Sequence, residues 1–133
     1  MLRTLFGFFT ILHGLVHLWP VVLSQGLVEY KPEMGWTGES WLLTTIVGEG
    51  ATRALASGLY ALAMVVFVAS GIGLFVSGDW WRPLLVGSAI LSAVVILLFW
   101  DGTGGQLVEK GLVGFLINVG ILLLVLVLNW PRT

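Results

Sequence analysis

Cysteine is absent from this 133-residue chain, and charged residues make up only 10% of it. Without cysteine there is no disulfide framework, no thiolate metal site and no cysteine nucleophile. A soluble domain carries roughly 25% charged residues, so this composition excludes an ordinary water-exposed surface. The formal net charge is −1 and no basic tract is present, which argues against a nucleic-acid partner.

Apolar sequence takes the place of charge: 58% of the residues are hydrophobic and the mean hydropathy is +1.03. A membrane-spanning helix needs about 20 mostly apolar residues. Four segments meet this need, at about residues 4–24, 52–77, 84–100 and 108–130. The sequence therefore predicts a single transmembrane domain over residues 1–133, an all-α integral membrane four-helix bundle of up-down topology in the lipid bilayer.

The orientation in the cell membrane is predicted from the placement of the basic residues. Lysine and arginine are equally numerous on the two sides of the predicted bundle, so the positive-inside rule does not decide by count. Arg3, Arg82 and Arg132 lie tight against helix ends on one side, whereas the basic residues of the other side lie in a long loop or near acids. We therefore predict that both termini are cytoplasmic.

The loop over residues 25–50 is the only extended polar stretch, and it is predicted to lie outside the cell. Residues 39–47 within it are expected to form a short helix along the membrane interface. Trp36 and Trp41 favour an interfacial anchor. A lid over the outer mouth of the bundle is the alternative.

Each predicted helix carries a stripe of small or polar residues, which suits close helix packing in lipid. The second helix has two such faces: one carries Ala54 and Gly58, and the other carries Arg53, Ser57 and Tyr60. We expect one face to pack within the bundle. The other would then pack against a second copy of the chain or another membrane subunit.

His13 and His17 are the sharpest chemical feature, because they lie one turn apart on the first helix. This spacing can place two imidazoles on one metal ion, as in helical zinc sites. At 1.5 Å rise per residue, His17 lies about 9 Å and His13 about 15 Å below the outer surface. The same arithmetic places Asn118 about 10 Å and Ser92 about 12 Å below it. These four residues are the candidate ligand- or metal-binding site.

Four charged residues are predicted to ring the mouth above this layer: Glu49, Arg53, Asp101 and Glu109. The sequence thus predicts a small polar pocket that opens outward. Three uses of the two histidines stay open: hydrogen bonding between helices, ligation of a metal ion or haem, and contact with a proton or small ligand.

Three segments together resemble a family of small four-span prokaryotic membrane proteins. They are residues 13–19 (HGLVHLW), 33–41 (EMGWTGESW) and 98–102 (LFWDG). The resemblance covers nearly the whole chain and implies a four-span membrane protein, but it implies no activity. In size and span count the chain is also similar to DoxX-type proteins, with which it shares no motif.

No nucleophile elbow, phosphate loop or carboxylate pair within a span is present, so the sequence favours a protein that is not an enzyme. The first hypothesis is a non-enzymatic membrane protein that forms a homo-oligomer or serves as an accessory subunit of a membrane complex. One alternative is a metal- or haem-binding protein that uses His13 and His17. The other is a transporter that takes a small solute through the outward-facing polar pocket.

Overall fold

The computed structural model describes residues 1–131 apart from 30, 32–35, 37, 106 and 109. The described chain is helical and contains no strand, which confirms the all-α prediction. Its helices are α1 (Leu2–Val16), α2 (Leu18–Ser24), α3 (Leu43–Val76), α4 (Trp81–Leu98), α5 (Leu112–Leu122) and the π-helix η2 (Leu123–Val127). Only His17 separates α1 from α2. Pro20 accounts for this break, since it has no N–H to donate to the carbonyl of Val16 four residues earlier.

Three helical stretches are long and apolar enough to cross a membrane: Leu2–Ser24, Leu43–Val76 and Trp81–Leu98. The fourth apolar helix, Leu112–Val127, is shorter than the predicted segment 108–130. Gly111 before it and Asn129 after it have positive φ angles of 107° and 51°. A right-handed helix cannot continue through this backbone conformation, so the helix is confined between them.

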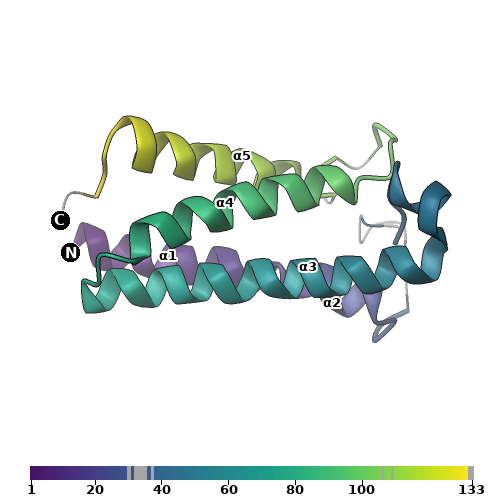
Figure 1. The fold of residues 1–133 in the computed structure, drawn as a ribbon, viewed down its shortest axis with the longest axis horizontal. Helices are drawn as coiled ribbons and strands as arrows, with labels where there is room; N and C mark the ends of the chain where they lie inside the picture. The colour runs from purple at the N-terminus through teal and green to yellow at the C-terminus, as the bar shows by residue number, and fades with distance from the viewer. Residues whose placement is uncertain (30, 32–35, 37, 106, 109, 132–133) are drawn as a thin grey trace.

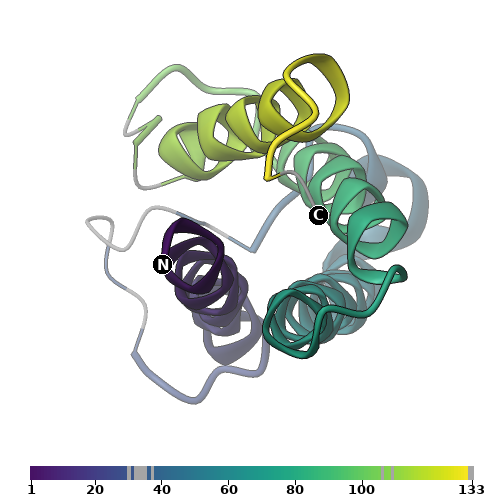
Figure 2. The same ribbon diagram turned by 90° about the vertical axis from the view of Figure 1, so that its left-hand side faces the viewer.

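The long helices run up and down along one axis, and both termini lie at the same end (Figure 1). We call this the terminal end. The opposite end, which holds the described residues between α2 and α3 and between α4 and α5, is the loop end. Viewed down the axis, α1, α3, α4 and α5 follow one another around the bundle (Figure 2). α3 packs on α1, α2 and α4, and α4 packs on α5, whereas α5 makes no comparable contact with α1.

Two apolar cores fill the bundle, one toward each end. The terminal-end core consists of Phe6, Phe67, Leu74, Trp81, Leu85, Ala89, Ile121 and Val125. The loop-end core consists of Leu23, Trp36, Ala56, Tyr60, Val95 and Phe99. Along α4, the buried Ser92 lies between Ala89 of one core and Val95 of the other. A layer of polar side chains therefore separates the two cores.

Glycine allows α1 and α3 to approach closely. A Cβ atom added to Gly14 of α1 would lie 2.7 Å from Cβ of Phe67 and 3.2 Å from the carbonyl oxygen of Met64 on α3. A Cβ added to Gly71 of α3 would lie 2.9 Å from the carbonyl oxygen of Gly7 on α1. Close approach through small residues is how helices associate where lipid provides no hydrophobic driving force.

The structure resolves which face of α3 lies inside the bundle. Tyr60 is buried in the loop-end core, together with Ala56 one turn before it. Ala54 and Gly58 are exposed on the outside, and a Cβ added to Gly58 would meet nothing within 4 Å. Among the described residues, the small-residue face of α3 at Ala54 and Gly58 thus lies on the outer surface of the bundle.

The short helix predicted over residues 39–47 is shorter in the structure and belongs to α3. Helical backbone begins at Leu43, and Gly48 interrupts it with φ 84° and ψ 169°. The start of α3 therefore turns across the loop end (Figure 1). Trp36 is only 6% exposed and packs in the loop-end core, whereas Trp41 is 55% exposed. Trp36 is therefore part of the core, whereas Trp41 stays at the surface.

Replacement of Gly14 by alanine tests the close approach of α1 and α3. We expect Gly14→Ala to lower the free energy of unfolding by about 1–3 kcal/mol, because Phe67 Cβ and a backbone carbonyl cannot move aside easily. Gly58→Ala is the matched control, and we expect it to be neutral or stabilising by up to about 1 kcal/mol. Thermal unfolding in detergent, followed by circular dichroism, compares the two. Equal effects of both substitutions would contradict this packing.

Candidate functional site

The polar layer is a continuous chain of hydrogen bonds between α1, α4 and α5. Nε2 of His13 lies 2.9 Å from Oδ1 of Asn118, and Nδ2 of Asn118 donates to Oγ of Ser92 at 2.8 Å. Oγ of Ser92 lies 2.5 Å from Nε2 of His17. All four side chains are buried, and Ser92 and Asn118 have no exposed surface. The structure thus brings together the four residues that sequence analysis grouped as one layer.

The partners of His17 fix the direction of every hydrogen bond in this layer. Nδ1 of His17 lies 3.0 Å from the carbonyl oxygen of His13 and 3.2 Å from that of Gly14. Carbonyl oxygens only accept, so Nδ1 of His17 carries a proton. In a neutral imidazole Nε2 is then an acceptor, which takes the proton of the Ser92 hydroxyl. Ser92 accepts from Asn118, whose oxygen accepts the Nε2 proton of His13.

The two imidazoles are held as neutral groups of opposite tautomer. Their ring centroids lie 5.4 Å apart at 87°, and Phe67 packs against both rings at 4.9 Å and 5.4 Å. A positive charge on one imidazole, beside the other imidazole and in an apolar, membrane-spanning layer, would cost free energy. Since Nε2 of His13 is the donor, its Nδ1 is an acceptor with a free lone pair.

A cavity of about 290 Å³ lies beside the polar layer, on the open side of the bundle. Its walls come from α1 to α5 and the loop end, and they include His13, His17, Trp36, Tyr60, Lys110 and Gly114. Val16 and Val113, which also line it, are 66% and 48% exposed. The cavity therefore opens sideways, toward the lipid-facing surface between α1 and α5.

Nδ1 of His13 and the hydroxyl group of Tyr60 are polar atoms of residues that line this cavity. Across the described residues, the only fully buried side-chain nitrogen or oxygen without a partner is Nη2 of Arg3. Nδ1 of His13 has no hydrogen bond either, so it keeps accessible surface. His13 is itself one of the residues that line the cavity.

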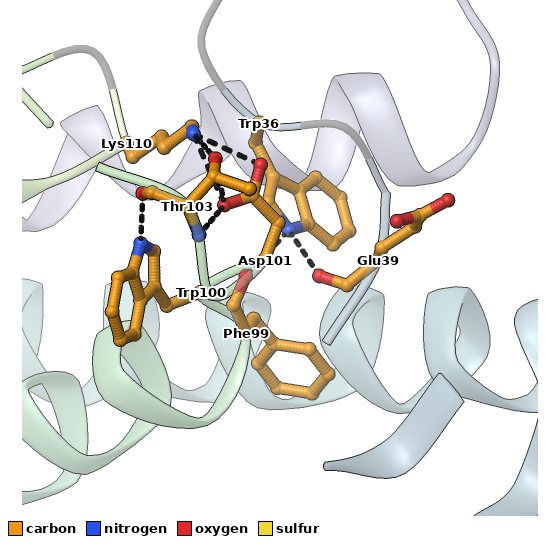
Figure 3. Close-up of polar contacts among 7 residues, drawn as sticks. All are labelled: Trp36, Glu39, Phe99, Trp100, Asp101, Thr103 and Lys110. Carbon is orange, nitrogen blue, oxygen red and sulfur yellow. Dashed lines mark hydrogen bonds and ion pairs between the residues drawn. The ribbon is translucent and has the colours of Figure 1, made fainter. Parts of the chain in front are cut away.

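The loop end closes the cavity from above through the carbonyl groups that α4 leaves unpaired at its C-terminus. Trp36 Nε1 donates to the carbonyl oxygen of Phe99 at 2.8 Å and to that of Glu39 at 3.2 Å (Figure 3). Ser40 Oγ donates to Leu98, Trp41 Nε1 donates to Leu97 at 2.8 Å, and the Trp41 amide donates to Trp100 at 2.7 Å. Four successive carbonyls, of residues 97–100, are therefore satisfied by Trp36, Ser40 and Trp41, as a helix end within a membrane requires.

An ion pair closes the connection from α4 to α5. Nζ of Lys110 lies 2.9 Å from Oδ2 of Asp101 and donates to Oγ1 of Thr103 at 2.6 Å (Figure 3). The Thr103 amide and hydroxyl donate to Oδ1 of Asp101 at 2.9 and 2.8 Å. Partial burial raises the pKa of the Asp101 carboxyl, but these hydrogen bonds and the Lys110 charge outweigh it, so the pKa lies below its ordinary value of 3.8.

Of the four residues predicted to ring the pocket mouth, Glu49, Arg53 and Asp101 are not among the residues that line the cavity. Asp101 is bound into the α4–α5 connection, and Glu49 is exposed beside the break in α3, outside the cavity. Arg53 lies against Gly38 of the loop, since a Cβ added there would meet its guanidinium group. Glu109 lies outside the described residues. These positions depend on how the loops fold back, which charge and spacing alone do not give.

Trp36, Tyr60 and Lys110 line the cavity but were not predicted as site residues. The sequence contained an indication for Tyr60, since Tyr60 marks the face of α3 that the bundle buries. Trp36 carried a weaker one, because a tryptophan in a polar loop suits an anchor equally well. Lys110 carried none, because its position follows from the ion pair with Asp101.

The chemistry of the donor set bears on the metal hypothesis. No group of three or more His, Asp or Glu side chains among the described residues is placed to share a metal ion. Both Nε2 atoms are engaged by Asn118 and Ser92, and Nδ1 of His17 is engaged by backbone carbonyls. A metal ion shared by His13 and His17 would have to displace a partner of His17. The arrangement fits hydrogen bonding better than ligation.

Comparison with known proteins leaves the site to be interpreted from its geometry. No protein-family model, curated protein or solved structure matches this chain.

Removal of a link from the polar layer should destabilise the bundle. We expect Asn118→Leu and Ser92→Ala each to cost about 1–3 kcal/mol, because each leaves a buried group without its partner. The double variant should cost less than the two together, since both disrupt one chain of hydrogen bonds. Unfolding of the four proteins in a detergent–denaturant titration measures this. Strict additivity would show that the links are independent.

The ion pair should make stability depend on acidity. The pKa of Asp101 in the folded protein lies below its ordinary value. The ionised carboxyl therefore contributes to the free energy of unfolding above about pH 4, and this contribution is lost as the pH falls through the folded pKa. We expect Asp101→Asn to reduce the fall in unfolding temperature between about pH 5 and pH 3. Asp79→Asn, at the opposite end of the bundle, is the control. An identical fall in wild type and Asp101→Asn would refute this role.

Proposed function

We propose that this membrane protein binds a small lipophilic molecule in the cavity between α1–α2 and α5. The carrying observation is a 290 Å³ cavity that opens toward lipid and ends at the histidines of the polar layer. Its size is near the lower limit of about 300–1,000 Å³ for small-molecule sites. Apolar walls with a few convergent polar groups are the usual composition of such sites.

The hydrogen-bond order of the layer restricts the chemistry of the ligand. Nδ1 of His13 accepts, so the ligand should carry a donor such as a hydroxyl group on an otherwise apolar body. Such a molecule partitions into the bilayer and reaches the cavity from the side, past Val16 and Val113. The well-packed terminal-end core blocks a path straight through the chain. This favours ligand binding over transport of a solute.

We further propose that both termini face the cytoplasm. Both lie at one end of the bundle (Figure 1), and Arg3 and Arg82 lie at that end, in the first turns of α1 and α4. Arginines directly at helix ends favour the cytoplasmic side. The His13–His17 cavity then lies in the outer half of the membrane.

Self-association is the second candidate function, and the outer face of α3 supports it. Ala51, Ala54 and Gly58 form an exposed stripe along which a second helix can approach closely. Energy transfer between labelled copies in liposomes tests this candidate. Gly58→Leu should reduce transfer if the stripe is the interface, and Gly120→Leu on α5 is the control.

Two matched probes test the ligand proposal: 1-naphthol, which has a hydroxyl donor, and 1-methoxynaphthalene, which has none. Quenching of tryptophan fluorescence reports binding, because Trp19 and Trp36 line the cavity. We expect the purified protein to bind 1-naphthol about tenfold more tightly, the value of one hydrogen bond. His13→Leu should remove this preference, whereas Val127→Ala, outside the cavity, should keep it. Equal binding of both probes by the wild type would overturn the proposal.

A further inference from the structure

Two arginines converge on one buried tryptophan at the terminal end of the bundle. The guanidinium carbons of Arg3 and Arg82 lie 5.7 Å and 5.9 Å from the ring centre of Trp81. Trp81 is 1% exposed and belongs to the terminal-end core. Both positive charges are therefore held against the same side chain of the terminal-end core.

Each arginine also satisfies the end of a neighbouring helix. Nε of Arg3 donates to the carbonyl oxygen of Leu74 at 2.8 Å, near the end of α3. Nη2 of Arg82 donates to the carbonyl oxygen of Val125 and, at 2.9 Å, to Oδ1 of Asn129. Helix C-termini leave carbonyl groups without partners and carry partial negative charge. These contacts fix both side chains but neutralise neither charge.

No carboxylate in the described part of the chain forms an ion pair with either arginine. The ion pair found there joins Lys110 to Asp101, at the loop end. Asp79 is exposed in the turn before α4 and is not paired with Arg3 or Arg82. Nη2 of Arg3 is fully buried and has no hydrogen-bond partner. A buried donor without a partner costs free energy unless an acceptor binds it. Arg3 and Arg82 therefore lack an anionic partner among the described residues.

We propose that Arg3 and Arg82 bind the phosphate of an anionic lipid at the membrane surface. Guanidinium groups bind phosphate through paired N–H donors, and basic residues beside membrane helices attract anionic lipids. Arg3 and Arg82 are both half-buried, so a phosphate reaches them from the surface. A small rotation of the Arg3 guanidinium would give Nη2 the same acceptor.

The surroundings favour a lipid over a soluble phosphate ester. Leu2 and Leu5 on α1 are 62% and 57% exposed, and Leu128 after η2 is 61% exposed. These side chains offer an apolar surface to acyl chains on either side of the arginines. Trp80, 47% exposed, is suited to the headgroup level of the membrane.

Native mass spectrometry of the full chain in detergent tests the site with phosphatidylglycerol and phosphatidylcholine, whose phosphate is offset by choline. We expect preferential binding of phosphatidylglycerol, and about a fivefold loss of that affinity in Arg3→Gln and in Arg82→Gln. Lys31→Gln, which removes a charge at the loop end, should stay within about twofold of wild type. Equal loss in all three variants would show attraction by net charge alone and overturn the site.

Two further arms separate the sources of phosphate and guard against misfolding. Inorganic phosphate at millimolar concentration should not displace phosphatidylglycerol; displacement would assign the cluster to a soluble phosphate compound instead. Arg3→Lys keeps a donor for the Leu74 carbonyl, but one ammonium group cannot reproduce the paired donors of a guanidinium. It should fold as wild type and still lose lipid affinity. Unchanged affinity in folded Arg3→Lys would contradict the proposal.

Discussion

The hydrogen-bond chain from His13 through Asn118 and Ser92 to His17 is the constraint on which the rest of this structure depends. Polar groups buried in a membrane protein must find partners within the protein. These four satisfy one another only if α1, α4 and α5 keep one relative position. Two other contacts must be compatible with that relative position: the packing of α1 on α3 at Gly14, and the hydrogen bonds between the loop and the end of α4. The cavity lies where α1 and α5 share this layer without packing on each other.

The loop before α3, the end of α4 and the histidines of the polar layer lie close together in the fold. Trp36, Ser40 and Trp41 satisfy the carbonyl groups of residues 97–100, and His17 forms a hydrogen bond with Ser92 on the same helix, α4. Trp36 packs with Phe99 and Tyr60 at ring distances of 6.2 and 6.3 Å. The polar layer, the cavity and the cover above it thus form one structural unit.

The hydropathy of the sequence was enough to predict the helical bundle. The rise per residue of a helix was enough to predict the common depth of four side chains, those of His13, His17, Ser92 and Asn118. Both predictions depend only on local sequence. Hydropathy and rise per residue failed where long-range folding decides. Asp101 and Glu49 were placed around a pocket mouth, but Lys110 holds Asp101 in a turn and Gly48 directs the chain near Glu49 outward. Trp36 was ambiguous, because its burial depends on carbonyl groups 63 residues away in the chain. The length of the last helix was overestimated, since the backbone conformations of Gly111 and Asn129 are invisible to hydropathy.

Nitrogen NMR of histidine-labelled protein in detergent measures the central claim most directly, because the two ring nitrogens report where each proton lies. The structure requires two neutral imidazoles of opposite tautomer, with the proton on Nε2 of His13 and on Nδ1 of His17. That result would leave Nδ1 of His13 as an acceptor on a residue that lines the cavity. Two rings of the same tautomer, or a charged imidazole at neutral pH, would contradict both the order of the polar layer and the ligand chemistry inferred from it.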